Sequence, residues 1–261
     1  MIESNANGQY KKLQKWMKQS RARRQEGVFV VEGWKMVKEA LERNLVLHLY
    51  SAEREQEHCR EELNRFSCGQ VPVDFMRDNL FSQLSDTVSP QGILGVVRMP
   101  VYEREEIVNQ PDAKLLCLEN IQDPGNLGTM FRTAEGAGMT GVVLTKGCVD
   151  LFNPKVVRST MGSLFRVPFY VCQDMEEEMK FMQKKGFCFY AAHLQGTKDF
   201  TKESYEGSIG ILIGNEANGL SEAVSGLADC KVKIPMEGEL ESLNAAVSAA
   251  LFMYEVRRKR R

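Results

Sequence analysis

The sequence contains 261 residues, of which 43% are hydrophobic and 26% are charged, and its formal net charge is −1. This length allows one large domain or two small ones around a sizeable core, and the composition is that of an ordinary globular protein. No apolar run approaches the roughly 20 residues of a membrane span, and the N-terminus lacks the apolar core of a secretory signal, so we expect a cytoplasmic protein without a membrane partner.

The first hundred residues predict alternating helices and strands. One helix has its apolar residues on a single face: Tyr10, Leu13, Trp16 and Met17. Gly27 can end it. Further strands are expected at 28–31, 45–50, 71–75 and 93–97, and helices at 34–41 and 53–66. We therefore expect residues 1–99 to form a small α/β domain.

A second domain is expected over residues 113–261. Residues 100–112 contain two prolines and a charge run without a sustained period, which is typical of a linker. Strands then follow at 114–118, 141–144, 169–171, 187–192 and 209–213, and helices at 126–138, 153–161, 174–185 and 243–256. This alternation predicts a mostly parallel sheet, so the fold class is α/β.

Two basic segments stand out in a nearly neutral chain. Between Lys11 and Arg24 there are seven Lys and Arg residues and no acid, and the chain ends in the basic run Arg257–Arg261. Together they favour a polyanion such as RNA as partner, although each alone could be a solvated helix face or a disordered tail. The seven cysteines include no C-x-x-C pair and the chain has three histidines, so we expect neither disulfides nor a metal site.

The first motif spans residues 120–134. Asp123, Pro124 and Gly125 predict a tight turn at the carboxyl end of a strand, where open α/β sheets bind ligands. Asn126 can cap the following helix, and Arg132 in its first two turns could reach back toward the loop. An arginine suits phosphate or carboxylate recognition, but a plain turn with a surface arginine would also explain this motif.

Two further motifs lie closer to the C-terminus. The segment 155–169 is explained by a helix–loop–strand connection. In the segment 209–221, an apolar strand ends at Gly214, which can expose backbone groups to a ligand, and the carboxylate of Glu216 follows. Beyond a further apolar run, Ser242 stands where the cap of the last helix is expected. That helix is apolar nearly all round, so it must be buried within the domain or at a subunit interface.

In this order, the three motifs resemble the signature motifs of the SpoU (TrmH-type) RNA ribose methyltransferases of the SPOUT superfamily. The resemblance covers roughly residues 115–250, and residues 1–99 resemble, more weakly, the family's N-terminal RNA-binding domain. It implies a catalytic domain whose C-terminal part forms a trefoil knot, a homodimer, and S-adenosyl-L-methionine as cofactor. The implied reaction methylates a ribose 2′-hydroxyl of structured RNA, ribosomal RNA in preference to tRNA.

The resemblance also implies the site residues. Those matching the catalytic positions are Arg132, Asn126, Glu216, Ser242 and Asn244. The cofactor would be held near His193, Leu194, Gly214, Ile234 and Leu243. Because a guanidinium hardly deprotonates, we expect Arg132 to clamp an RNA phosphate and stabilise the developing alkoxide, within one subunit or across the dimer interface. The family often has Val-Ser where this chain has Ala245 and Ala246, a difference that affects packing more than activity.

Other functions compete with this hypothesis. A tRNA ribose methyltransferase would share the same motifs. A non-catalytic RNA-binding ribosome-assembly factor could share the scaffold, but it would not need the polar residues of the motifs. A nucleotide-dependent Rossmann enzyme is disfavoured, because the chain lacks G-x-G-x-x-G and carries Thr145-Lys146, with no acidic residue, after the strand at 142–144.

Overall fold

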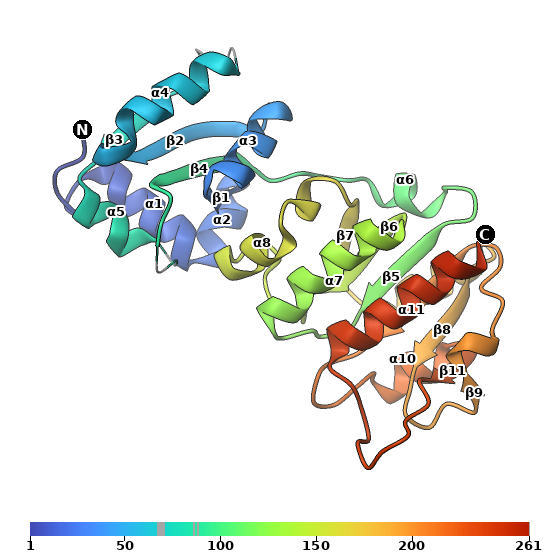
Figure 1. Ribbon diagram of the computed structural model, residues 1–261. Helices are drawn as coiled ribbons and strands as arrows, with labels where there is room; N and C mark the ends of the chain where they lie inside the picture. Colours follow the sequence, from blue (N-terminus) through green and yellow to red (C-terminus); the bar gives the residue numbers. More distant parts are fainter. Residues whose placement is uncertain (67–70, 86, 88, 261) are drawn as a thin grey trace. The chain divides into compact units, whose positions relative to one another are not determined.

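The computed structural model describes residues 1–66, 71–85, 87 and 89–260, and the chain divides into two compact units (Figure 1). The first unit contains Met1–Pro100 and Asp150–Phe165, and the second contains Val101–Val149 and Arg166–Arg261. Cys68 and Arg261 lie outside the described residues. Within the described part of the chain, no helix has both the length and the apolar character needed to cross a bilayer.

The first unit is built on a four-stranded sheet in the order β1-β4-β2-β3. β4 is antiparallel to both β1 and β2, whereas β2 and β3 are parallel. The elements from the N-terminal part of the chain are α1 (Gly8–Lys18), α2 (Ser20–Glu26), β1 (Val28–Glu32), α3 (Trp34–Glu42), β2 (Val46–Ala52), the 3-10 helix η1 (Glu53–Glu55), α4 (Gln56–Arg65), β3 (Val73–Met76), α5 (Asp78–Leu84) and β4 (Ile93–Arg98).

The N-terminal basic helix is interrupted, contrary to the prediction of one continuous helix. Gln19 leaves the helical conformation with φ −121° and ψ 110°, so α1 and α2 are separate helices. Gly27 ends α2 in the left-handed conformation, as expected. The predicted apolar face of α1 packs into the core of the first unit through Tyr10, Leu13, Trp16 and Met17.

The second unit contains a seven-stranded sheet in the order β7-β6-β5-β10-β8-β11-β9, and all its strand pairs are parallel. Its elements are α6 (Arg104–Val108), β5 (Lys114–Leu118), α7 (Pro124–Ala137), β6 (Gly141–Thr145), β7 (Phe169–Cys172), α9 (Met175–Gln183), β8 (Cys188–Ala192), β9 (Lys198–Asp199), the 3-10 helix η3 (Phe200–Lys202), β10 (Ile209–Ile213), α10 (Glu222–Leu227), β11 (Cys230–Lys233) and α11 (Ala245–Lys259). The parallel sheet confirms the predicted α/β class.

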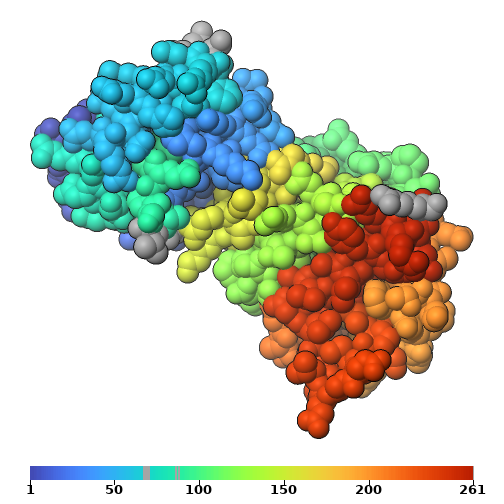
Figure 2. Space-filling model, in the orientation of Figure 1, coloured from blue at the N-terminus to red at the C-terminus, as the bar shows by residue number. Residues whose placement is uncertain are grey.

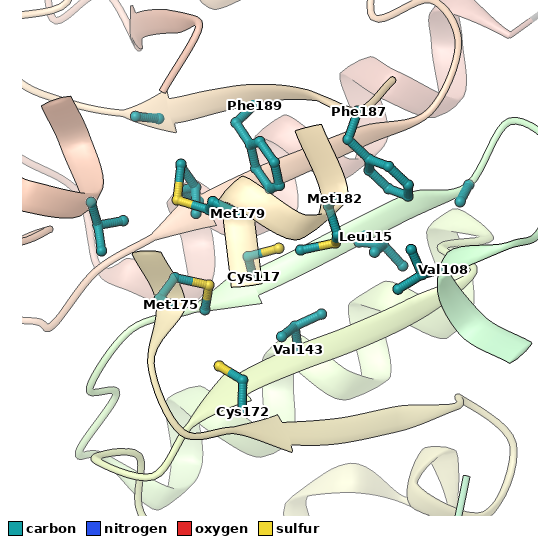
Figure 3. Packing of buried hydrophobic residues seen from close by; sticks show 14 of the residues in the cluster. Val108, Leu115, Cys117, Val143, Cys172, Met175, Met179, Met182, Phe187 and Phe189 are labelled. Carbon is teal, nitrogen blue, oxygen red and sulfur yellow. The ribbon is translucent and has the colours of Figure 1, made fainter. Parts of the chain in front are cut away.

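Helices cover both faces of this sheet. Because side chains alternate along a strand, Leu115 and Cys117 of β5 point to one face, where the methionines of α9 pack on them (Figure 3). On the other face α7 and α11 lie side by side (Figure 1). α7 begins just after β5 ends, and Asn244 at the start of α11 contacts Asn126 of α7. Both helices therefore begin beside the carboxyl edge of the sheet.

The structure differs from the expected linker at residues 100–112. These residues include α6, in which Ile107 and Val108 are buried in the core of the second unit. Arg104 donates a hydrogen bond of 2.8 Å from Nε to Oε1 of Glu178, and its guanidinium lies 3.6 Å from the ring centre of Phe181. A five-residue helix has too few residues to show a period, which is why its sequence resembled a linker.

The segment Asp150–Phe165 packs with the first unit, although the sequence placed it inside the second domain. It contains α8 (Pro154–Thr160), which Asn153 caps as expected, and the 3-10 helix η2 (Ser163–Phe165). Arg23, 2% exposed, forms an ion pair with Asp150 and donates hydrogen bonds to the carbonyls of Trp16 and Met17. This buried contact joins the start of the segment Asp150–Phe165 to α1 and α2, so Arg23 is not part of a free basic face.

Candidate functional site

A cavity of about 640 Å³ lies at the carboxyl ends of three adjacent strands, β10, β8 and β11. Its walls come from the segments that follow these strands and from the chain that leads into α11: residues 192–195, 213–220, 232–236, 240–243, 245, 248 and 252. Figure 2 shows part of the orange-red segment between β11 and α11 protruding from the second unit. Parallel strands gather their carboxyl ends at one edge, and this edge is where α/β sheets place ligands.

The five residues expected to hold a cofactor all line this cavity, and Glu216 and Ser242 line it as well. The five are His193, Leu194, Gly214, Ile234 and Leu243. Burial, and then the nearby Lys231, lower the pKa of His193. Its Nδ1 accepts a hydrogen bond of 3.1 Å from the amide of Gln195. Both effects favour the neutral form of the imidazole over the cation.

Gly214 is required by its own loop. A Cβ at this position would lie 2.1 Å from the carbonyl carbon of Gly219, because the loop folds back over it. Asn215 and Gly219 exchange two backbone hydrogen bonds of 3.0 and 2.9 Å, which closes the turn. Glycine is therefore needed at position 214 for a second reason besides leaving space for a ligand: any side chain there would displace the loop that forms the wall of the cavity.

The carboxylate of Glu216 joins the first motif to the third. It accepts hydrogen bonds of 3.1 Å from the amides of Gln122 and Asp123, and one of 3.0 Å from Nδ2 of Asn126. Partial burial alone would raise the pKa of Glu216, but the hydrogen bonds from Asn126 and the backbone amides outweigh it and lower the pKa. Glu216 is thus an ionised acceptor with both oxygens engaged, which suits it to positioning rather than to proton transfer.

Asn126 continues this contact toward the last helix. Its Oδ1 accepts a hydrogen bond of 2.9 Å from Nδ2 of Asn244, and Oδ1 of Asn244 accepts from the amides of Ala246 and Val247 at 2.9 and 3.3 Å. A hydrogen-bonded chain therefore runs from Glu216 through Asn126 to Asn244 and fixes the orientation of both amides. Three of the five predicted catalytic residues are brought together.

Two capping predictions were wrong. Asp123 caps α7 by accepting a hydrogen bond of 2.7 Å from the amide of Asn126, so Asn126 lies inside the first turn with its side chain free to reach Glu216. Asn244 caps α11, so Ser242 stands outside the helix, exposed and in the cavity wall. In both cases an Asp or Asn close in sequence is the cap. Asp, Asn and Ser are all favourable N-cap residues, so residue type alone could not decide between them.

Arg132 stands apart from this chain of hydrogen bonds. It lies in the third turn of α7, because the helix begins at Pro124, two residues earlier than expected. Its side chain is exposed, and no carboxylate of the described residues pairs with it. It does not line the cavity of its own chain. An unpaired guanidinium on a helix beside the site can receive a phosphate.

The sequence did not reveal the residues that hold the third motif in place. Glu119, 7% exposed, accepts hydrogen bonds of 2.8 Å from both the amide and the hydroxyl of Ser221, which caps α10. Nδ2 of Asn215 donates a hydrogen bond of 2.8 Å to the carbonyl of Asn120, which adopts φ 56°. An acidic residue directly after a buried strand was the available signal for Glu119. Within the described ranges, no three His, Cys, Asp or Glu side chains are grouped as metal ligands would be.

Comparison with known proteins relates both parts of the chain to RNA-modifying enzymes. Residues 113–254 match the model of the SpoU rRNA Methylase family, and residues 7–95 match that of the MRM3-like substrate binding domain. The chain is 32% identical to the 23S rRNA (guanosine(2553)-2′-O)-methyltransferase RlmP of Bacillus subtilis, over 98% of each chain. It is 30% identical to the 23S rRNA (uridine(2479)-2′-O)-methyltransferase of Streptomyces viridochromogenes, over 98% of this chain and 92% of that one.

A solved structure agrees over the same extent. The SpoU methyltransferase AviRb from Streptomyces viridochromogenes, in complex with the cofactor AdoMet, superposes with a TM-score of 0.89 at 28% identity. The match covers 97% of this chain and 98% of that one. It therefore includes both units and the segments around the cavity.

Proposed function

The chain belongs to the SpoU rRNA Methylase family, and from this premise we propose that it methylates a ribose 2′-hydroxyl of 23S ribosomal RNA. It is an RNA 2′-O-methyltransferase that uses S-adenosyl-L-methionine. The observation that carries the proposal is the cavity at the carboxyl ends of β8, β10 and β11, joined to the first motif by the hydrogen bonds of Glu216 and Asn126.

The cavity fits the cofactor in size and chemistry. Its volume of about 640 Å³ is within the roughly 300–1,000 Å³ of small-molecule sites. The backbone of three loops and the apolar side chains of Leu194, Ile234 and Leu243 line it, and neutral His193 adds no repulsion toward a sulfonium cation. S-adenosyl-L-methionine supplies an electrophilic methyl group on its sulfonium sulfur. We assign its binding to these residues together with Gly214.

The polar residues position the RNA in this proposal. Glu216 holds the turn at Gln122 and Asp123, so the N-terminal end of α7 keeps a fixed place relative to the cavity. Asn126 and Asn244 each retain a second N–H on their amide nitrogens, which can donate to a ribose or phosphate oxygen. Arg132 binds the adjacent phosphate and stabilises negative charge that develops on the attacking oxygen. Ser242 offers a hydroxyl in the cavity wall.

We further propose a homodimer and a trefoil knot in the C-terminal part. The dimer is supported by α11, on which Val247, Leu251 and Tyr254 are 49%, 38% and 49% exposed at helical spacing. Arg132 lies outside the cavity of its own chain, which fits action across the subunit interface. The proposed knot is supported by membership of this family.

Ribosomal RNA is favoured over tRNA by the extent of the matches. The two curated rRNA methyltransferases align over 98% of this chain, so the likeness includes the first unit as well as the catalytic unit. The alternative of a non-catalytic assembly factor is disfavoured, because a pure RNA binder would not need Asn126 and Glu216 arranged beside a cavity of cofactor size.

The test is methyl transfer by the purified protein to protein-free 23S rRNA, 16S rRNA and total tRNA, with S-adenosyl-L-methionine labelled on the methyl group. We expect label in 23S rRNA, at a ribose that becomes resistant to alkaline cleavage. Label confined to tRNA would instead support the alternative of a tRNA ribose methyltransferase. Cofactor binding by calorimetry without transfer to any RNA would favour the assembly factor.

A further inference from the structure

The outward face of α1 and the start of α2 form a row of unpaired positive charges. Lys11, Lys15 and Lys18 lie at helical spacing on the side of α1 opposite its buried face, and Arg21 follows on α2. We call these four residues the α1–α2 basic surface. All four side chains are exposed, and no acidic side chain in the described part of the chain forms an ion pair with them.

Several other basic side chains of the first unit form ion pairs with acidic residues. Lys38 and Arg65 both pair with Glu62, and further pairs are Arg43–Glu39, Arg54–Glu55, Arg77–Glu3, Lys12–Glu26 and Arg23–Asp150. Lys11, Lys15 and Lys18 instead repel one another within α1, since like charges three or four residues apart destabilise a helix by a few tenths of a kcal/mol. Like charges gathered on one exposed face, without acidic partners, are a candidate site for binding a polyanion.

The second basic segment of the sequence does not have this property. Arg257 donates a hydrogen bond to the carbonyl of Gly136, and Arg260 donates to the carbonyls of Gly138 and Asp112. Arg258 and Lys259 pair with Glu255. The described part of the C-terminal run therefore fastens α11 within the second unit. From the sequence, both basic segments were candidates for RNA binding. In the structure, the charges of the C-terminal segment contact the protein itself, whereas those of the α1–α2 basic surface face solvent.

We propose that the α1–α2 basic surface binds the phosphate backbone of the substrate RNA. Lys11 to Lys18 span about 10 Å along the helix at 1.5 Å per residue, a length that can contact several successive phosphates. Flexible ammonium groups contact phosphates as point charges, without reading base sequence. The surface thus supplies affinity, and the choice of nucleotide lies elsewhere.

The inference rests on the proposed function, because it takes the RNA of that reaction as its ligand. RNA is favoured over an anionic membrane because α1 turns its apolar residues into the core of the first unit. A helix that lies on a bilayer needs such a face for the lipid. The charges are also fixed by two packed helices, which suits a folded partner of fixed shape.

The test is the salt dependence of RNA binding by the full-length protein. The variant is Lys11→Gln/Lys15→Gln/Lys18→Gln, which preserves helix propensity. The matched control is Lys180→Gln/Lys184→Gln/Lys202→Gln, which removes the same charge from exposed lysines of the second unit. Binding to protein-free 23S rRNA is measured between 50 and 200 mM salt at fixed pH, together with affinity for S-adenosyl-L-methionine.

Each lost phosphate contact lowers the slope of log K against log salt by about 0.7–0.9. The variant should therefore lose about 2 to 3 from the slope and roughly 50- to 200-fold in affinity near 0.15 M salt, with cofactor affinity unchanged. Its KM for rRNA should rise while kcat stays constant. An unchanged slope, an equal loss in the control, or loss of binding to phosphatidylserine vesicles with rRNA affinity intact would overturn the proposal. A wild-type protein that binds rRNA through this surface but methylates none would contradict the proposed function alone.

Discussion

Replacing Glu216 by alanine should weaken the junction between the first and third motifs. The change removes one acceptor from three donors: the amides of Gln122 and Asp123 and Nδ2 of Asn126. A hydrogen bond contributes about 0.5–1.5 kcal/mol net, and water can replace part of it at this exposed position. We therefore expect a loss of about 1–2 kcal/mol in the free energy of unfolding.

The effect on activity should be larger than the effect on stability. Release of the turn lets Asn126 and the start of α7 move, and a shift of about 1 Å in a positioning group can cost about 100-fold in rate. Urea unfolding and kcat/KM on rRNA measure the two effects. Glu237→Ala is the matched control, since Glu237 is an exposed carboxylate on the loop after β11. It should change the free energy of unfolding by less than about 0.5 kcal/mol.

The pH dependence gives a second readout of the same contact. The pKa of Glu216 is lower in the folded protein than in the unfolded chain, so the native state binds fewer protons at this residue. The ionised carboxylate therefore stabilises the fold fully above the ordinary pKa of 4.5, and this stabilisation is lost as pH falls through the folded pKa. Glu216→Gln should remove this component of acid destabilisation. Full stability and full activity in Glu216→Ala, or the same acid sensitivity in Glu216→Gln, would refute the positioning role.

Three further changes test other parts of the structure. Arg132→Ala should lower kcat by about 100- to 1,000-fold without changing urea stability, because the side chain is exposed and unpaired; a stability loss equal to the rate loss would argue for a structural role. Asp150→Ala should cost about 3–5 kcal/mol in urea unfolding, since it leaves the guanidinium of Arg23 buried and uncompensated, whereas a neutral result would mean that water reaches it. Leu251→Glu should convert the proposed dimer to a monomer in light scattering, and an unchanged mass would place the interface elsewhere.

The sequence predicted those features that depend on local pattern. Apolar runs such as 114–118 and 209–213 became strands of the parallel sheet, and Gly27 and Asn153 ended and began helices as expected. Short elements escaped prediction because they contain too few residues for a period. The five-residue α6 is an example, as is α5, whose buried Leu80, Phe81 and Leu84 are identified by tertiary packing.

The contacts within the site could not be read from the sequence. Asn126 and Asn244 are 118 residues apart, and Glu119 and Ser221 are 102 apart, so their pairing depends on the order of strands in the sheet. For the same reason Arg23 was grouped with the free basic residues, because its partner Asp150 is 127 residues away. The helix caps were also mispredicted, because more than one residue near each helix start can act as a cap. Asp123 caps α7 in place of Asn126, and Asn244 caps α11 in place of Ser242.

Ribose methylation of ribosomal RNA can be measured by mapping 2′-O-methylation across all stable RNAs in cells with and without this gene. We predict that one ribose in 23S rRNA loses its methyl group on deletion and regains it with the wild-type gene but not with Arg132→Ala. Unchanged methylation at every rRNA and tRNA ribose would show that the protein does not methylate these RNAs.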